Sequence, residues 1–107
     1  LPIRVPAQVG HGRHAHHLFA IHVDPAQRDA ILSNINAAGI GATVNYRALQ
    51  TLSLFKEDQV DAPVALEWGQ GTLSLPLYPS LTQDAQDIVI AAVESAVCGQ
   101  KLRKRSA

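Results

Sequence analysis

The sequence predicts an α+β domain, a two-layer sandwich in which helices pack on one face of a small sheet of about three strands. Two observations lead to this fold class. Short segments with alternating apolar residues are separated by segments in which apolar residues recur every three or four positions, in the order β-α-β-(α)-β-α. The chain has 107 residues, which is enough for one modest hydrophobic core.

The first strand and the first helix are predicted between His17 and Gly39. Three apolar residues at alternate positions define one face of the strand: Phe19, Ile21 and Val23. Asp24 is a good N-cap and Pro25 suits the first helical position, so we expect the helix to begin there. Gly39 supplies a left-handed stop. The inner face of this helix is formed by Ile31, Ile35 and Ala38.

A second strand is predicted over residues 40–46, where Ile40, Ala42, Val44 and Tyr46 alternate with small or polar residues. Within residues 47–61, Leu49, Leu52 and Phe55 have helical spacing but no cap precedes them, so we expect a short helix or a turn there. Asp61 can cap a further helix that starts at Ala62-Pro63.

The third strand and the last helix have the clearest signals. The strand covers residues 73–77, and Pro76 and Pro79 confine it to an edge or end it. Thr82 is the expected N-cap of the helix and Gly99 its expected end. One continuous apolar face runs along this helix: Ala85, Ile88, Val89, Ala92, Val93, Ala96 and Val97.

Composition and charge place the chain among ordinary globular domains. It is 47% hydrophobic and 17% charged, with a formal net charge of zero. The charge is uneven, because Lys101, Arg103, Lys104 and Arg105 give residues 100–107 a basic character. We expect a solvated, disordered tail there, and a nucleic-acid or lipid contact is the weaker alternative because no aromatic residue is interleaved.

Targeting and redox features are few. No apolar run approaches the length of a membrane span, and no signal peptide is visible, so we expect a cytoplasmic protein with no membrane partner. The single cysteine, Cys98, excludes a disulfide within the chain and is expected to be a small buried group. The start at Leu1 rather than Met suggests that the chain was cut from a longer one.

Few residues suggest chemistry. Four histidines lie within seven positions, namely His11, His14, His16 and His17, but no cysteine or carboxylate stands at ligand spacing, so we expect no metal site. No serine stands in a nucleophile-elbow context and no glycine-rich loop leads from a strand into a helix. We therefore expect no catalytic residue in this chain.

The end of the second strand is the best candidate for a binding site. Asn45, Tyr46 and Arg47 present an amide, a phenol and a guanidinium at one place. A guanidinium makes paired hydrogen bonds to a carboxylate or a phosphate, so these three residues suit a substrate that carries such a group. The alternative is an ordinary polar strand end.

Three segments resemble a known family. The strand His16 to Asp24, the segment Ala38 to Tyr46 and the motif Leu73 to Thr82 (LSLPLYPSLT) are similar, in this order, to the small C-terminal domain of the DegT/DnrJ/StrS sugar aminotransferases. The resemblance covers roughly residues 14–97, and the last motif is the most specific. It implies a connecting segment at 1–15, an aminotransferase-like small domain at 16–99 and the basic tail at 100–107.

The resemblance implies an activity for the complete enzyme. Such enzymes use pyridoxal phosphate (PLP), bound through a lysine, to move an amino group from an amino acid to a nucleotide-linked keto-sugar, as in polysaccharide biosynthesis. The cofactor lysine belongs to a large PLP-binding domain, and none of the three lysines here has its sequence context, so this chain alone is expected to bind no cofactor and to be inactive. Its expected partners are that large domain, a second copy in a homodimer and the nucleotide-sugar and amino-acid substrates.

One position departs from the family pattern. Asn45 stands where the family has a histidine before Tyr46, and an amide donates a hydrogen bond but does not carry a proton at neutral pH. The alternative function is a free-standing module, derived from this domain, that binds a metabolite or dimerises.

Overall fold

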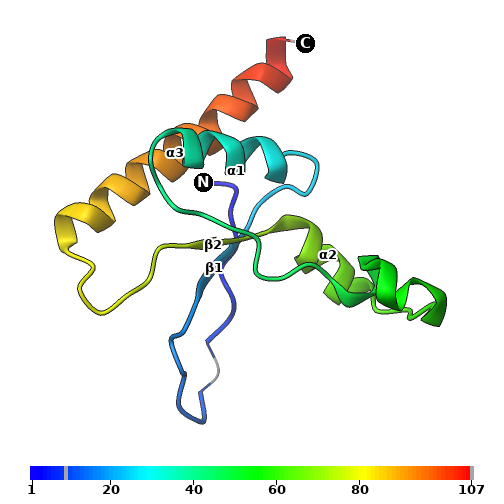
Figure 1. Cartoon of the computed structure of the whole chain (residues 1–107). Coiled ribbons are helices and arrows are strands. Elements are labelled where there is room, and N and C mark those ends of the chain that lie inside the picture. Colours follow the sequence, from blue (N-terminus) through cyan, green and yellow to red (C-terminus); the bar gives the residue numbers. More distant parts are fainter. Residues whose placement is uncertain (9, 107) are drawn as a thin grey trace.

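The structure is a computed structural model of the chain that describes the backbone of residues 1–8 and 10–106, and the side chains up to residue 99 (Figure 1). In chain order the described elements are β1 (Phe19–His22), α1 (Arg28–Ala37), the 3-10 helices η1 (Leu49–Thr51) and η2 (Ser53–Asp58), α2 (Pro63–Gly71), β2 (Thr72–Leu75) and α3 (Gln83–Ser106). This is an α+β fold, as predicted from the sequence.

The sheet is narrow. β1 and β2 pair antiparallel, with Phe19 opposite Leu75 and Ile21 opposite Leu73. A single residue extends the sheet at each edge: Arg4 bridges to His22 beside β1, and Thr43 bridges to Ser74 beside β2.

The expected second strand is reduced to this bridge at Thr43. Thr43 exchanges two backbone hydrogen bonds with Ser74, of 3.2 and 2.8 Å. The amides before Thr43 are engaged elsewhere, because the Ile40 N–H donates to the Ile35 carbonyl and the Ala42 N–H donates to Oδ1 of Asn36 at 3.0 Å. The chain just before Thr43 is therefore tied to the end of α1, and its pairing with β2 is limited to Thr43.

The core lies between the sheet and two helices. α1 and α3 pack together on one side of the strands (Figure 1). Their inner faces and the strands contribute the buried apolar side chains: Ile21, Val23, Ile31, Ile35, Ala42, Leu73, Val93, Ala96 and Val97. The predicted inner faces of both helices are confirmed in their middle turns, although Ile88 of α3 is 60% exposed and Ala38 is exposed.

The first helix starts later than its sequence predicts. Asp24 forms a turn instead of an N-cap: its Oδ1 accepts the Ala26 N–H at 3.0 Å and its carbonyl accepts the Gln27 N–H at 2.9 Å. An aspartate bonds its own backbone two residues on as readily as it caps a helix. α1 therefore begins at Arg28, and Gly39, with φ 86°, ends it as predicted.

The irregular segment and α2 agree with the sequence except at one cap. Residues 47–61 contain the two 3-10 helices, as expected for a short helix or turn. Ala62, not Asp61, is the N-cap of α2 and makes no side-chain cap hydrogen bond, while Pro63 occupies the first turn. β2 runs from Thr72 to Leu75, so it begins one residue earlier than the predicted 73–77 and ends two residues earlier, directly before Pro76.

The last helix differs at its end. Thr82 caps it as predicted, since its Oγ1 accepts the Ala85 N–H at 3.1 Å. Gly99 does not end it, because α3 continues to Ser106; a glycine inside a helix costs only about 1 kcal/mol. The expected disordered tail is thus helical in its backbone, while its basic side chains lie outside the described ones.

Two further findings concern α3 and the helices as a group. Cys98 is exposed, not buried as expected, because it stands about 100° around the helix from buried Val97. Within the described part of the chain, none of the helices combines the length and the apolar composition that crossing a bilayer takes.

Candidate functional site

The segment Asn45–Arg47 follows the Thr43 bridge and precedes η1. Its central residue, Tyr46, is 71% exposed, and Arg47 is exposed as well, whereas Asn45 is half-buried. The structure therefore presents the phenol and the guanidinium to solvent, where a ligand can reach both.

The backbone of this segment is anchored immediately after Arg47. Ala48 is 7% exposed and contacts Gly69 of α2. A Cβ atom on Gly69 would collide with the Ala48 backbone nitrogen and come within 3.0 Å of its Cβ. Only glycine allows α2 to approach the segment so closely.

The end of α2 is held in turn by a buried arginine of α1. Arg28 is 5% exposed, and its Nη1 donates to the carbonyl oxygens of Gly69 at 3.0 Å and Thr72 at 3.4 Å. Its Nε donates to Oδ1 of Asp29 at 2.7 Å. A cation at a helix C-terminus is favourable, because it meets the unpaired carbonyls and the negative end of the helix dipole.

Asp29 is the side-chain partner of this arginine. The hydrogen bond and the charge of Arg28 lower the pKa of its carboxyl, desolvation raises it, and the charge of Arg47 lowers it further.

A second polar cluster lies at the other edge of the sheet. Nη2 of Arg4 donates to Oε1 of Glu67 at 2.6 Å and lies 3.1 Å from Nδ1 of His22, while the guanidinium carbon lies 5.3 Å from the centre of the Trp68 ring. Nε2 of His22 lies 3.1 Å from the Glu67 carbonyl oxygen. Arginine only donates and a carbonyl only accepts, so one tautomer of His22 satisfies both contacts, with the proton on Nε2.

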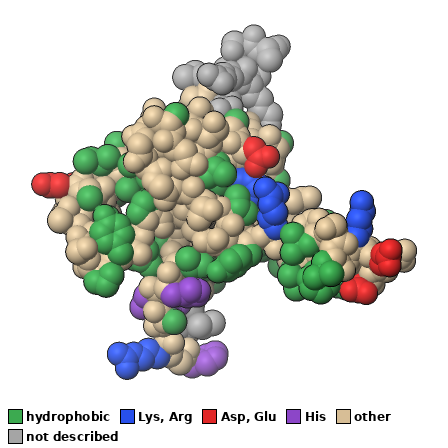
Figure 2. Space-filling view, in the orientation of Figure 1, with side chains coloured by type: hydrophobic (Ala, Val, Ile, Leu, Met, Phe, Trp, Pro, Cys, Tyr) green, Lys and Arg blue, Asp and Glu red, His purple; other side chains and the backbone are tan. Residues whose placement is uncertain are grey.

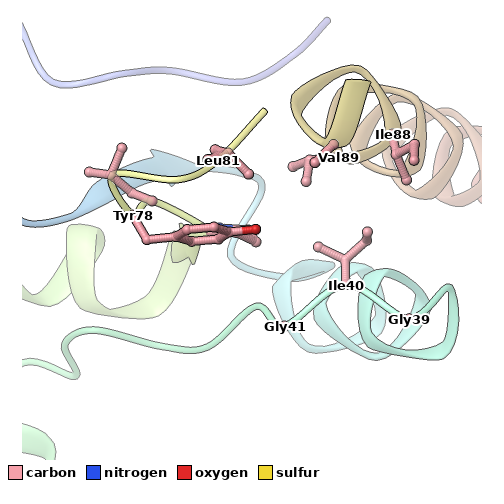
Figure 3. Close-up of a pocket in the computed structure, with 10 residues that line it drawn as sticks. Gly39, Ile40, Gly41, Tyr78, Leu81, Ile88 and Val89 are labelled. Atoms are coloured by element: carbon pink, nitrogen blue, oxygen red, sulfur yellow. The ribbon is translucent and has the colours of Figure 1, made fainter. Parts of the chain in front are cut away.

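A shallow pocket of about 560 Å³ opens between the end of α1, the loop after β2 and the first turns of α3. Its walls are mostly apolar, and the Tyr78 hydroxyl points between Ile40 and Val89 (Figure 3). Its lining includes none of Asn45, Tyr46 and Arg47, so the pocket and the candidate segment are separate features.

The histidines and lysines contribute little to the site. His14 and His16 stack with their ring centres 4.3 Å apart, and Nδ1 of His14 accepts the His16 N–H at 2.8 Å. Among the described side chains no three histidine, cysteine or carboxylate groups gather as metal ligands would. The one lysine with a described side chain, Lys56, is exposed on η2 and outside the pocket.

The sequence indicated Asn45, Tyr46 and Arg47 but missed the residues that support them. The sequence singled out neither Arg28 nor Gly69. Neither carries a sequence signal for its role, because the residues in contact lie far apart in the chain. Arg28 and Gly69 are 41 positions apart, and Gly69 and Ala48 are 21 positions apart.

A family model, the DegT/DnrJ/EryC1/StrS aminotransferase family, matches residues 1–94. Similar solved structures include ntda from Bacillus subtilis with the bound cofactor PMP, at 26% identity and a TM-score of 0.74 over 90% of this chain and 23% of that one. DesV from S. venezuelae, in complex with a ketimine intermediate, is 26% identical with a TM-score of 0.73 over 90% of this chain and 27% of that one.

The aminotransferase TlmJ from Streptoalloteichus hindustanus shares the fold, with a TM-score of 0.82 and 23% identity over 94% of this chain and 27% of that one. The chain thus spans about a quarter of the length of each of these three structures.

Proposed function

Because the chain belongs to the DegT/DnrJ/EryC1/StrS aminotransferase family, we propose that it is the small domain of a PLP-dependent sugar aminotransferase. The complete enzyme transfers an amino group from an amino acid to a nucleotide-linked keto-sugar. We place it in the cytoplasm as a homodimer, with the small domain seated against a large PLP-binding domain.

The observation that carries this proposal is an apolar surface beside the candidate site. The segment from η1 to α2 projects away from the core as an arm (Figure 1). Its exposed apolar side chains gather on one face of the molecule (Figure 2): Leu49, Leu54, Val60 and Val64, which are 62%, 82%, 54% and 68% exposed. Surfaces of this kind mark contacts with another protein part. A large domain docked here covers the arm and lies next to Tyr46 and Arg47.

The described residues of this chain do not fit PLP by themselves. The cofactor needs a lysine that is held beside a phosphate-binding backbone. Lys56, the one lysine with a described side chain, is exposed on the 3-10 helix η2 and does not meet this requirement. PLP in the complete enzyme supplies the electron sink for transamination, and the large domain binds it.

The contribution of this chain is substrate binding. The Arg47 guanidinium pairs with a planar carboxylate or phosphate of the substrate, and Tyr46 adds a hydroxyl that both donates and accepts. The Asn45 amide orients a substrate oxygen without taking up or releasing a proton.

The first test is the reading frame upstream of the Leu1 codon in the native gene. A frame that continues into a domain with a candidate cofactor lysine supports the proposal. A start codon directly upstream contradicts it and leaves the free-standing binding or dimerisation module as the better account.

The second test addresses the site in the purified complete enzyme. Arg47→Ala is expected to raise, roughly ten-fold, either the KM for L-glutamate or the Kd for UDP, a nucleoside diphosphate. The KM is measured by the absorbance change of the cofactor, and the Kd by titration. Arg13→Ala, which removes an exposed arginine of the loop at residues 11–15, is the matched control. If the Arg47 variant binds both probes like the unaltered enzyme, Arg47 is outside the substrate site.

A further inference from the structure

Burying an arginine destabilises a fold unless the N–H groups of its guanidinium find hydrogen-bond acceptors. Arg28 is buried, and it donates hydrogen bonds to Asp29 on its own helix and to the carbonyl oxygens of Gly69 and Thr72. These two carbonyls stand on either side of the junction between α2 and β2. Arg28 therefore holds the point at which α2 ends.

That point is also where α2 meets the candidate site. The Gly69 carbonyl oxygen accepts a hydrogen bond from Arg28, and the Cα of Gly69 packs against the Ala48 backbone. Ala48 follows Arg47 directly. A shift of the end of α2 therefore moves the backbone from which Arg47 projects.

We propose that Arg28 is a positioning residue for the segment Asn45–Arg47, which it fixes through Gly69 and Ala48 without touching the substrate. This inference rests on the proposed function, because it gives Arg28 a role only if Arg47 binds a substrate anion. Arg28, which lies 19 positions before Arg47 in the chain, thereby becomes a determinant of that binding.

The experiment measures KM and kcat of the complete enzyme with L-glutamate as the probe. Arg28→Met removes the donors to both carbonyls and is expected to raise KM about five- to ten-fold, with kcat changed less than about two-fold. Arg28→Lys retains one cationic donor and is expected to recover part of the loss. Arg4→Ala, which loosens α2 on its other side and leaves the Gly69–Ala48 contact, is the control and should leave KM unchanged.

Arg28→Lys keeps the buried charge, so it decides the matter if Arg28→Met does not fold. Its KM for L-glutamate is expected to rise about two- to three-fold with kcat nearly unchanged, because one ammonium cannot reproduce the donors of the guanidinium.

The outcomes separate the two proposals. If Arg47→Ala weakens the binding of L-glutamate or of UDP while the Arg28 variants leave the binding of that same probe unchanged, the positioning role is wrong and the proposed binding site stands. If Arg47→Ala leaves the binding of both probes unchanged, the proposed site fails and the positioning role fails with it. An equal rise of KM in Arg28→Met and Arg4→Ala also overturns it, because general loosening of α2 then explains the effect.

Discussion

Arg4 and Glu67 are separated by 63 positions in the chain and joined by an ion pair of 2.6 Å. The pair connects the first residues of the chain to α2, and the backbone of Arg4 also exchanges hydrogen bonds of 2.9 and 2.8 Å with His22. The segment that enters the domain is thus fastened by both backbone and side chain.

Arg4→Ala is expected to loosen this segment. Both side chains of the ion pair are about half exposed, so the pair contributes little, and the ring contact with Trp68 adds a similar amount; we expect a total loss of about 1–2 kcal/mol. Hydrogen exchange of the Arg4 amide reports the loss as a lower free energy of local opening.

The matched control for this prediction is Glu67→Gln, which keeps an acceptor and loses only the charge. It should cost less than about 1 kcal/mol. Equal exchange rates in the Arg4 variant and the unaltered protein would show that the backbone hydrogen bonds alone hold the segment.

Gly71→Ala is expected to destabilise the domain by about 1–3 kcal/mol, because a Cβ there would collide with the His22 ring and come within 2.6 Å of the Val23 carbonyl oxygen. Urea denaturation measures the effect. Gly99→Ala is the control: it lies within α3 with nothing inside 4 Å of the added atom, so it should gain about 0.5–1 kcal/mol. A loss in both variants would contradict the steric explanation.

Thr82→Ala is expected to lower the free energy of unfolding by about 1 kcal/mol, because it removes the acceptor for the Ala85 N–H at the start of α3. Thr82→Ser keeps the hydroxyl and should stay close to the unaltered stability. If serine and alanine at this position prove equally destabilising, the lost methyl group and not the cap is responsible.

The pH dependence of stability should contain a contribution from Asp29. Its pKa is lowered from the model-peptide value of 3.8, chiefly by Arg28, so its stabilising effect is fully present above 3.8 and is lost as the pH falls through the lowered value. The difference in stability between the unaltered protein and Asp29→Asn should therefore shrink as the pH is lowered below 3.8. A difference that stays constant through this range would show that the carboxylate charge is not involved.

The parts of the fold that depend on neighbours in the sequence were predictable. The strand at Phe19–His22, the stop at Gly39 and the cap at Thr82 are all set within a few residues. The α+β class follows from the order of such segments.

The parts that failed depend on competition between partners. The stretch expected as a strand at 40–46 is tied to α1 through the N–H groups of Ile40 and Ala42, and Asp24 formed a turn where it could have capped a helix. Gly99 stayed helical because its cost is small compared with the helix that surrounds it. A local pattern cannot choose between two partners of similar strength.

The candidate site was predictable only in its outer residues. Tyr46 and Arg47 could be proposed from their chemistry, since an exposed guanidinium and phenol at a strand end suggest binding. Arg28 and Gly69 could not, because their importance comes from carbonyl and backbone contacts made across the domain.

The single-residue bridges at the two margins of the sheet bear on how the protein avoids aggregation. An open strand edge offers a row of unpaired amides that can recruit a strand of another molecule. Here one margin is the lone rung at Arg4, placed between Pro2 and Pro6, which have no amide hydrogen to offer, and the other is the lone rung at Thr43. The sheet thus terminates on both sides before a template for strand addition can form, and its small width is itself a safeguard against edge-to-edge association.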